Sequence, residues 1–282
     1  MRGPPTANDI VGQAVEQTDH RGVDADGMMT REESLAQAQR VIRSIVVSRH
    51  DRPSLVAQIA SEVGAEIVEA IIPPGYDLNT VELSRRYDTS RTPVREALIL
   101  LENEGLVDIP PRRRPRAHVH TLTEVSEIYR TRTALFELMA ADLAAKATEE
   151  HIALLRGILK RMEKAAEIGD AVAFSWLSVE FHDHDTRASG NQTAKRIHDS
   201  LLLRTLAMRR ISLSLPDRMA RSLEDHIQLV KAYENRDSHL AGALIRANHM
   251  AALSALEKHY RHIGGFRPRL AGEPLDPTPA AS

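Results

Sequence analysis

The sequence contains no cysteine. This absence excludes disulfide bridges and thiolate metal ligands, and it agrees with the reducing conditions of the cytoplasm. The chain also lacks a run of about eighteen apolar residues, the minimum for a transmembrane helix, and its N-terminus lacks the apolar core of a signal peptide. We therefore expect a cytoplasmic protein with no membrane partner.

A strong net charge is missing as well, because 37 Lys and Arg residues face 39 Asp and Glu residues, a formal net charge of -2. A chain with this balance is not a uniformly basic nucleic-acid coat, and any affinity for DNA must come from local groups of basic residues. Its 282 residues suit two domains of ordinary size.

The stretch from Ser90 to Leu106 has a clear helical pattern. Ser90 can accept a hydrogen bond from a free amide of the first turn, and Pro93 lies early enough that its missing N–H costs no hydrogen bond. Gly105 can end the helix in the left-handed conformation. Apolar residues recur at three- and four-residue spacing and form one stripe that must be buried: Val94, Ala97, Leu98 and Leu101.

A different face of this helix carries Arg91, Thr92 and Arg95, close to its N-terminus. Guanidinium groups one turn apart can enter the DNA major groove and pair with guanine O6 and N7. A solvated surface helix would show the same residues. The flanking segments must therefore distinguish a recognition helix from an ordinary one.

Two further helices and a hairpin surround this segment. Apolar periodicity predicts helices from Ser54 to Ile72 and from Leu78 to Tyr87, with Pro73-Pro74-Gly75 between them. Downstream, Leu106 to Ile109 and Ala117 to His120 have the pattern of paired strands. Residues 53–120 are therefore predicted to form a winged helix-turn-helix DNA-binding domain with a small β-hairpin wing.

The predicted turn of the wing has a high density of basic residues and no acid. Its arginines are Arg112, Arg113, Arg114 and Arg116. A small hairpin cannot bury four guanidinium groups, so we expect them to contact DNA phosphates, which adds affinity without sequence preference. A basic linker would have a similar composition, but the order of three helices and a hairpin favours one DNA-binding module.

Several segments of this module resemble the GntR family of bacterial transcription regulators. They are Pro73-Pro74-Gly75, Leu78, Glu82-Leu83, the run from Ser90 to Leu98, and Glu104 to Val107. The resemblance implies that Arg91, Thr92 and Arg95 contact a near-palindromic operator in double-stranded DNA. At the wing tip, where that family usually has a glycine, this chain has Arg116, whose side chain could reach a groove or a phosphate.

The two ends of the chain have a different composition. Residues 1–52 are an N-terminal extension, which we expect to be partly disordered with one helix from Arg31 to His50, and residues 264–282 are expected to be a flexible tail. Three roles stay open for this helix: packing on the DNA-binding module, packing on a partner subunit, or an upstream addition that the module does not need.

After the wing the sequence has only helical patterns. We predict an antiparallel helical bundle over residues 121–263 and therefore a mainly α fold class. Its six predicted helices are Thr123 to Ala147, Glu149 to Ile168, Ala171 to Ala188, Gln192 to Leu213, Arg218 to Glu234 and Ser238 to His262.

The order of landmarks in this half resembles the FCD effector-binding domain of the FadR subfamily. The matching residues are Tyr129, Arg132, Phe181-His182, Ala188 to Asn191, Asp225-His226, Ala232, Arg236-Asp237 and Ala241. The resemblance implies a small carboxylate effector beside a divalent metal such as zinc or nickel, held by an Asp or Asn and three histidines.

Two of the implied metal ligands are present, as His182 and His226. The Asp or Asn expected one turn before His182 is Ser178. The last histidine position falls on Asn248, with His249 one residue later. Further ligands are therefore uncertain, and Asp185 or His249 could serve.

The predicted effector-binding residues are Arg132, His182, His226 and Asn248. A guanidinium group can hold a carboxylate through two parallel hydrogen bonds, which makes Arg132 the first candidate. A salt bridge from Arg132 to an acidic residue of a neighbouring helix is the alternative.

The sequence favours a homodimeric, ligand-responsive transcription regulator, most simply a repressor, in which effector binding changes the placement of the two DNA-binding domains. One alternative is an enzyme that uses His182 and His226, although no nucleophile constellation or phosphate-binding glycine loop supports it. Another is a DNA-architectural protein that ignores metabolites and has no enclosed pocket.

Overall fold

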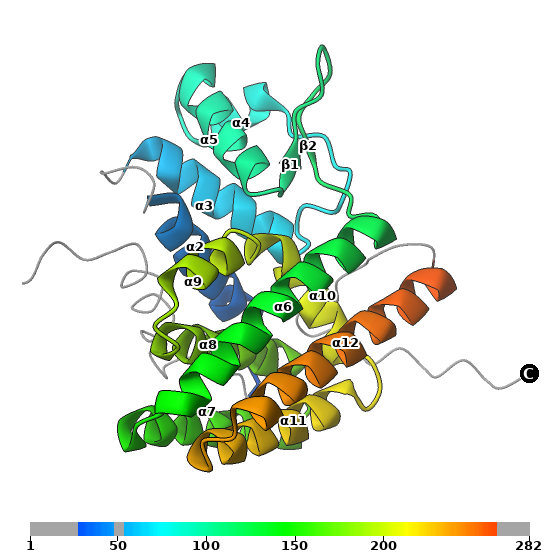
Figure 1. Ribbon diagram of the computed structural model, residues 1–282. Coiled ribbons are helices and arrows are strands. Elements are labelled where there is room, and N and C mark those ends of the chain that lie inside the picture. The colour runs from blue at the N-terminus through cyan, green and yellow to red at the C-terminus, as the bar shows by residue number, and fades with distance from the viewer. Residues whose placement is uncertain (1–27, 48–53, 264–282) are drawn as a thin grey trace, which may run out of the picture.

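The computed structural model describes residues 28–47 and 54–263, which form a small head above a larger helical bundle (Figure 1). The head contains α3 (Leu55–Val68), α4 (Thr80–Arg86), α5 (Arg91–Asn103), β1 (Val107–Asp108) and β2 (Arg116–Ala117). The bundle contains α6 (Leu122–Lys146), α7 (Glu149–Glu167), α8 (Ala171–Ala188), α9 (Gln192–Asp199), α10 (Leu203–Ser214), α11 (Arg218–Glu234) and α12 (Ser238–Ile263). One more helix, α2 (Arg31–Val47), precedes the head.

Helix α5 buries the predicted apolar stripe completely, with Val94, Ala97, Leu98 and Leu101 each 0% exposed. Ser90 takes the N-cap position, but its side chain makes no capping hydrogen bond, contrary to our expectation. A capping side chain accepts from the second or third helical residue, and the third is Pro93, which has no N–H.

The wing is an antiparallel pair in which Val107 lies opposite Ala117 and Asp108 lies opposite Arg116. Both strands are shorter than predicted, and the second begins one residue earlier, at Arg116. The prolines at 110, 111 and 115 between the strands cannot donate ladder hydrogen bonds, which limits the pairing to the base of the hairpin.

The bundle has seven helices in the described part of the chain, because the predicted helix from Gln192 to Leu213 is wrong as a single element. It breaks into α9 and α10 at residues 200–202, with no glycine or proline at the break. Leu202 and Leu203 enter the core of the head, whereas Ile197 of α9 is 46% exposed. Tertiary packing therefore sets this break.

Helix α2 occupies the junction between head and bundle; the last three residues of the predicted helix, 48–50, and the predicted stop signal at 51–53 lie outside the described residues. Its buried side contributes Ala38, Val41 and Ile42 to a core shared with α3 and α5. Trp176 of α8 joins the same core and donates from Nε1 to Ser34 Oγ over 2.9 Å. Of the roles left open for this helix, packing on the DNA-binding module is confirmed.

The two longest helices, α6 and α12, lie side by side along the bundle (Figure 1).

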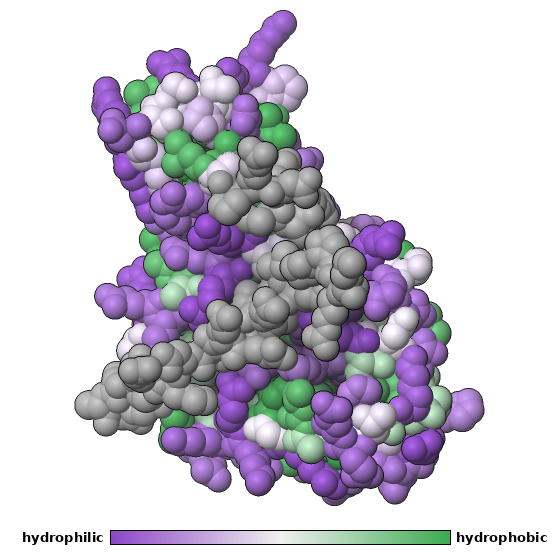
Figure 2. Space-filling view, turned by 90° about the vertical axis from the view of Figure 1, so that its left-hand side faces the viewer, coloured by the Kyte–Doolittle hydropathy of each residue, from purple (hydrophilic) through white to green (hydrophobic). Residues whose placement is uncertain are grey.

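On the face shown in Figure 2, hydrophilic residues predominate and the apolar areas are small and separate. None of the described helices combines the length and apolar content needed to cross a lipid bilayer.

Candidate DNA interface and effector cavity

The outer face of α5 is free of internal partners. Arg91, Thr92 and Arg95 are exposed at its N-terminal end. Neither arginine forms an ion pair with any described residue. The burial of the opposite stripe fixes the helix so that these guanidinium groups face solvent.

The wing presents a second basic surface. Arg112, Arg113 and Arg114 are exposed in the turn between β1 and β2, and Arg112 has a positive φ of 60°. Arg116 differs from them, because it lies in β2 at the base of the hairpin, where its Nε donates to Asp108 Oδ2 over 3.2 Å. Its predicted place at the wing tip is therefore wrong, since the tip is made by the preceding turn.

A small, partly open cavity of about 40 Å³ lies between α6, α8, α10, α11 and α12. Three arginines reach this cavity, Arg132, Arg209 and Arg218, and no described carboxylate lines it. Burial lowers the pKa of Arg132 to about 9 and lowers the pKa of the other two, because a cation loses hydration there. Arginine still stays protonated at neutral pH, so the cavity is strongly positive.

Arg132 is held in place by neutral groups rather than by an acid. It donates to Thr205 Oγ1 and, from Nη2, to His198 Nε2 over 2.7 Å. Because arginine is a donor only, His198 must carry its proton on Nδ1, which lies 3.2 Å from Asp199 Oδ1. The alternative of a salt bridge from Arg132 is wrong.

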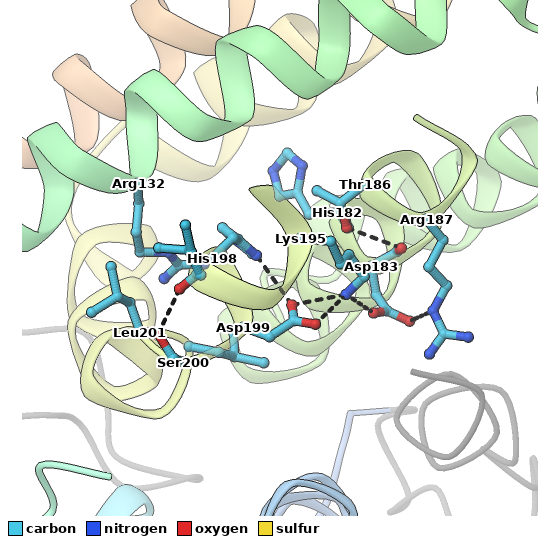
Figure 3. A network of polar contacts seen from close by, with 12 residues as sticks. Arg132, His182, Asp183, Thr186, Arg187, Lys195, His198, Asp199, Ser200 and Leu201 are labelled. Atoms are coloured by element: carbon cyan, nitrogen blue, oxygen red, sulfur yellow. Dashed lines mark hydrogen bonds and ion pairs between the residues drawn. The ribbon is translucent and has the colours of Figure 1, made fainter. Parts of the chain in front are cut away.

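A polar network continues from His198 away from the cavity (Figure 3). The buried Lys195 donates from Nζ to Asp199 over 2.7 Å and to Asp183 of α8 over 3.0 Å. These contacts fix α9 against α8 and thereby orient His198 toward Arg132. This network therefore holds the Arg132 guanidinium group in position through His198.

The other two cavity arginines were not identified from the sequence. Arg209 donates from Nη1 to Ser178 Oγ over 2.7 Å. Arg218 has a buried Nε and Nη1 without a hydrogen-bond partner among the described residues. Consecutive arginines at 209 and 210, between the buried Met208 and Ile211, were a signal that one of them serves a buried site.

The predicted histidines lie next to the cavity. The ring of His182 has its centroid 5.0 Å from that of His226 and 5.7 Å from that of His249. Asn248 and His249 are both buried and both line the cavity. Either residue, or both, can therefore contact a molecule in it. Asp185 Oδ2 lies 3.2 Å from His182 Nδ1.

His226 has a defined tautomer. Its Nδ1 donates to the Ser222 carbonyl oxygen over 2.6 Å, and its buried Nε2 has no hydrogen-bond partner among the described residues. Burial lowers the pKa of His226 to about 3, so the ring is neutral. Its free lone pair can accept a hydrogen bond or bind a metal.

No three of the predicted metal ligands bring their ligand atoms within 4.8 Å of one another; in the described part of the chain that spacing is found at His118, His120 and Glu124. This group lies where the wing meets α6, away from the cavity. It was not identified from the sequence, although two histidines two residues apart with a glutamate four residues later are a recognisable signal.

Residues 55–115 match the family described as bacterial regulatory proteins, gntR family, and residues 127–252 match the FCD domain. These two regions contain the recognition helix with its wing, and the cavity.

The curated relatives include regulators matched over much of their length. The probable D-xylose utilization operon transcriptional repressor of Paenarthrobacter nicotinovorans is 30% identical over 220 residues, 75% of this chain and 92% of that protein. The gluconate operon transcriptional repressor of Bacillus licheniformis is 28% identical, covering 67% of this chain and 79% of that protein.

The fold has solved counterparts. The structure of E. coli McbR/YncC superposes with a TM-score of 0.61 at 23% identity. The match covers 74% of this chain and 100% of that chain. This likeness concerns the fold alone. The family matches and the curated relatives establish that the chain belongs to the GntR family of bacterial transcription regulators, with a C-terminal FCD domain of the FadR subfamily, and is a regulator rather than an enzyme.

Proposed function

We propose that this chain is a metabolite-responsive repressor that binds a near-palindromic operator as a homodimer. The observation that carries the proposal is the arginine-lined cavity of the bundle, in the same molecule as an exposed arginine face on α5. Two relatives are named as operon repressors, which supports repression. Two heads related by two-fold symmetry suit two half-sites.

In this proposal the recognition helix and the wing have different tasks. Arg91, Thr92 and Arg95 contact base edges in the major groove. The turn arginines at 112–114 contact phosphates. Arg116 contributes less, since its guanidinium group already pairs with Asp108.

This division of tasks can be measured. We expect Arg95→Ala to cost about 1–3 kcal/mol on the operator and to reduce the preference over random DNA, because a base contact is lost. Arg113→Ala should weaken binding to both DNAs alike and flatten its salt dependence. Fluorescence anisotropy on both duplexes at several salt concentrations makes the measurement, and equal loss of sequence preference in the two variants would contradict the assignment.

The effector that fits the cavity is a small carboxylate anion. Three guanidinium groups without a lining carboxylate need negative charge, and Arg218 retains unpaired N–H donors. A carboxylate accepts bidentate hydrogen bonds from such groups. Asn248 and His249 line the same space and can bind hydroxyl groups of the effector.

A divalent metal fits this part of the bundle poorly. Ser178 stands where an acidic ligand is expected and already accepts a hydrogen bond from Arg209, and burial keeps the pKa of Asp185 raised well above its ordinary value. The positive charge is thus supplied by guanidinium groups. The metal site at His182, His226 and Asp185 or His249 stays a prediction, which elemental analysis of the parent and of His182→Ala would test.

The choice of anion can be tested with gluconate, a sugar acid, and D-xylose, a neutral sugar, the two compounds after which two relatives' operons are named. We expect sugar acids such as gluconate to raise the melting temperature and neutral xylose to leave it unchanged, because only the acid supplies the charge that the arginines need. Arg209→Gln should lose this response, and the exposed Arg221→Gln should keep it. A response to the neutral sugar that survives in Arg209→Gln would contradict the anion assignment.

The cavity also bears on the architectural alternative. A protein that only shapes DNA has no reason to keep three arginines in a hollow inside its bundle, away from the DNA-binding face. The arginine-lined cavity therefore favours a regulator that responds to a ligand.

A further inference from the structure

A second group of metal-ligating side chains lies outside the effector cavity, where the wing meets the bundle. His118 and His120 follow β2, and Glu124 lies in the first turn of α6. One ligand atom from each lies within 4.8 Å of the other two. We propose that His118, His120 and Glu124 bind a divalent transition-metal ion that ties the base of the wing to α6.

The distances place the three ligand atoms around a common point. His118 Nε2 lies 2.8 Å from Glu124 Oε2, and His120 Nδ1 lies 3.7 Å from the same oxygen. The two imidazole rings meet edge to face with centroids 4.6 Å apart. A metal ion among them needs only small adjustments of side chains, since metal–nitrogen and metal–oxygen bonds are about 2.0–2.2 Å long.

The local sequence explains why the three groups converge. Residues two apart in an extended chain point to the same side, which brings the two histidines together. Thr121 then caps α6 by accepting from the Glu124 backbone N–H over 3.2 Å. Glu124 is therefore in the first turn, with its side chain directed back toward the strand.

His118 bridges Asp108 and Glu124 through its two ring nitrogens, but the hydrogen bonding of the group is incomplete at His120. His120 Nδ1 is buried and has no hydrogen-bond partner among the described residues, which is costly for a buried polar atom. His118 Nδ1 lies 2.7 Å from Asp108 Oδ1. A carboxylate behind a histidine in this way fixes the ring and directs its other nitrogen at a metal.

The donor set selects the class of ion. Two imidazole nitrogens and one carboxylate oxygen suit zinc or nickel, with the remaining positions taken by water. Magnesium and calcium prefer an all-oxygen site. Asp108 and Glu124 place two carboxylates beside the imidazole rings, against the one guanidinium group of Arg116 that pairs with Asp108. A divalent cation therefore does not enter an already positive environment.

Such an ion would link DNA binding to metal supply. It would join the strand that carries the wing to the helix that carries Arg132, and so restrict the motion of the hairpin against the bundle. We expect metal to strengthen the salt-dependent, phosphate-directed part of DNA affinity. This site is independent of the proposed anion effector, and either proposal can fail without the other.

Cobalt(II) titration of the full-length, tag-free chain tests the site, followed by displacement with zinc. We expect one cobalt per chain with a visible absorption band, which His120→Ala loses. Asp108→Asn should lower the cobalt affinity about 10- to 100-fold. Two controls should keep the band: the exposed His239→Ala, and His182→Ala beside the cavity.

A second readout does not depend on cobalt spectra. Zinc should raise the melting temperature of the parent and leave that of Glu124→Gln unchanged, with the metal-free melting temperatures showing that each variant folds. Absence of cobalt uptake by the parent, or an unchanged titration in His120→Ala, would overturn the proposal. Loss of the band in His182→Ala but not in His120→Ala would place the metal in the bundle and overturn it as well.

Discussion

Gly105 ends the recognition helix at a position that no other residue fills without strain. It has φ of +73°, its N–H donates to the Glu102 carbonyl oxygen over 2.9 Å, and the next amide, of Leu106, donates to Leu101 over 2.9 Å. Both bonds belong to the glycine-ended helix stop that the sequence predicted. A Cβ at this position would also collide with the Arg204 side chain.

We expect Gly105→Ala to lower the free energy of unfolding by about 1–2 kcal/mol, because an L side chain disfavours the left-handed conformation. Urea denaturation measures the change. The control is Gly157→Ala in the middle of α7, where a Cβ meets nothing within 4 Å. That substitution should raise stability by about 0.5–1 kcal/mol. A loss of similar size at both positions would contradict the conformational explanation.

At the scale of single residues, the sequence predicted what depends on local spacing and missed what depends on convergence. The buried stripe of α5 and the outward arginines follow from helical periodicity alone. Arg209 and Arg218 reach one cavity only because five helices meet there, and no local pattern contains that information. Ser90 failed as a side-chain cap for a local reason, the proline three residues later.

Among the elements, the contact between α3 and α10 depends on a buried ion pair. Arg210 donates through both terminal nitrogens to Glu69, the C-cap residue of α3, and the two side chains are 2% and 1% exposed. The Nη2 group of Arg210 also lies 3.4 Å from Ser34 Oγ of α2. The pair therefore connects the head, the N-terminal helix and the bundle.

We expect Arg210→Met to destabilise the protein by about 3–5 kcal/mol, because it leaves the carboxylate of Glu69 buried without a partner. The double variant Arg210→Met/Glu69→Leu should recover most of this loss, since neither charge then needs compensation. Arg246→Met, which breaks an exposed pair with Glu137, should cost less than about 1 kcal/mol. Chemical denaturation of the parent and the three variants decides, and a double variant no more stable than Arg210→Met would refute the pairing explanation.

The elements themselves were predictable where the sequence carries capping and stop signals. The bounds of α8 and α11 agree with the prediction; Asp170 caps α8 through its side chain, whereas Asp217 before α11 makes no capping hydrogen bond, and the break there follows Pro216. The division of residues 192–213 into α9 and α10 could not be predicted, because it follows from leucines that leave the bundle for the core of the head.

At the scale of the whole molecule, the head is not a separate unit on a linker. Trp176 and Val179 of α8 and Leu202, Leu203 and Leu206 near the start of α10 belong to the same apolar core as α2, α3 and α5. Sequence patterns show that each helix has a face to bury but not which partner covers it. The shared core therefore could not be predicted from the sequence.

One connection between the cavity and the recognition helix passes through α10. Thr205 binds Arg132 in the cavity wall, and the adjacent Arg204 donates from Nη2 to the Asn103 carbonyl oxygen, at the end of α5, over 3.5 Å. In the proposed regulator, an anion that draws Arg132 away from Thr205 would change the restraint on α10, and Arg204 would carry that change to α5. We expect Arg204→Ala to keep DNA affinity and gluconate affinity each within about threefold of the parent, because the residue touches neither ligand. The coupling free energy between them, typically about 1–3 kcal/mol, should fall toward zero, since the contact that links the two sites is gone.

Operator affinity measured with and without saturating gluconate gives this coupling free energy for the parent and for Arg204→Ala. Coupling of parental size in Arg204→Ala would assign the transmission to the shared core instead.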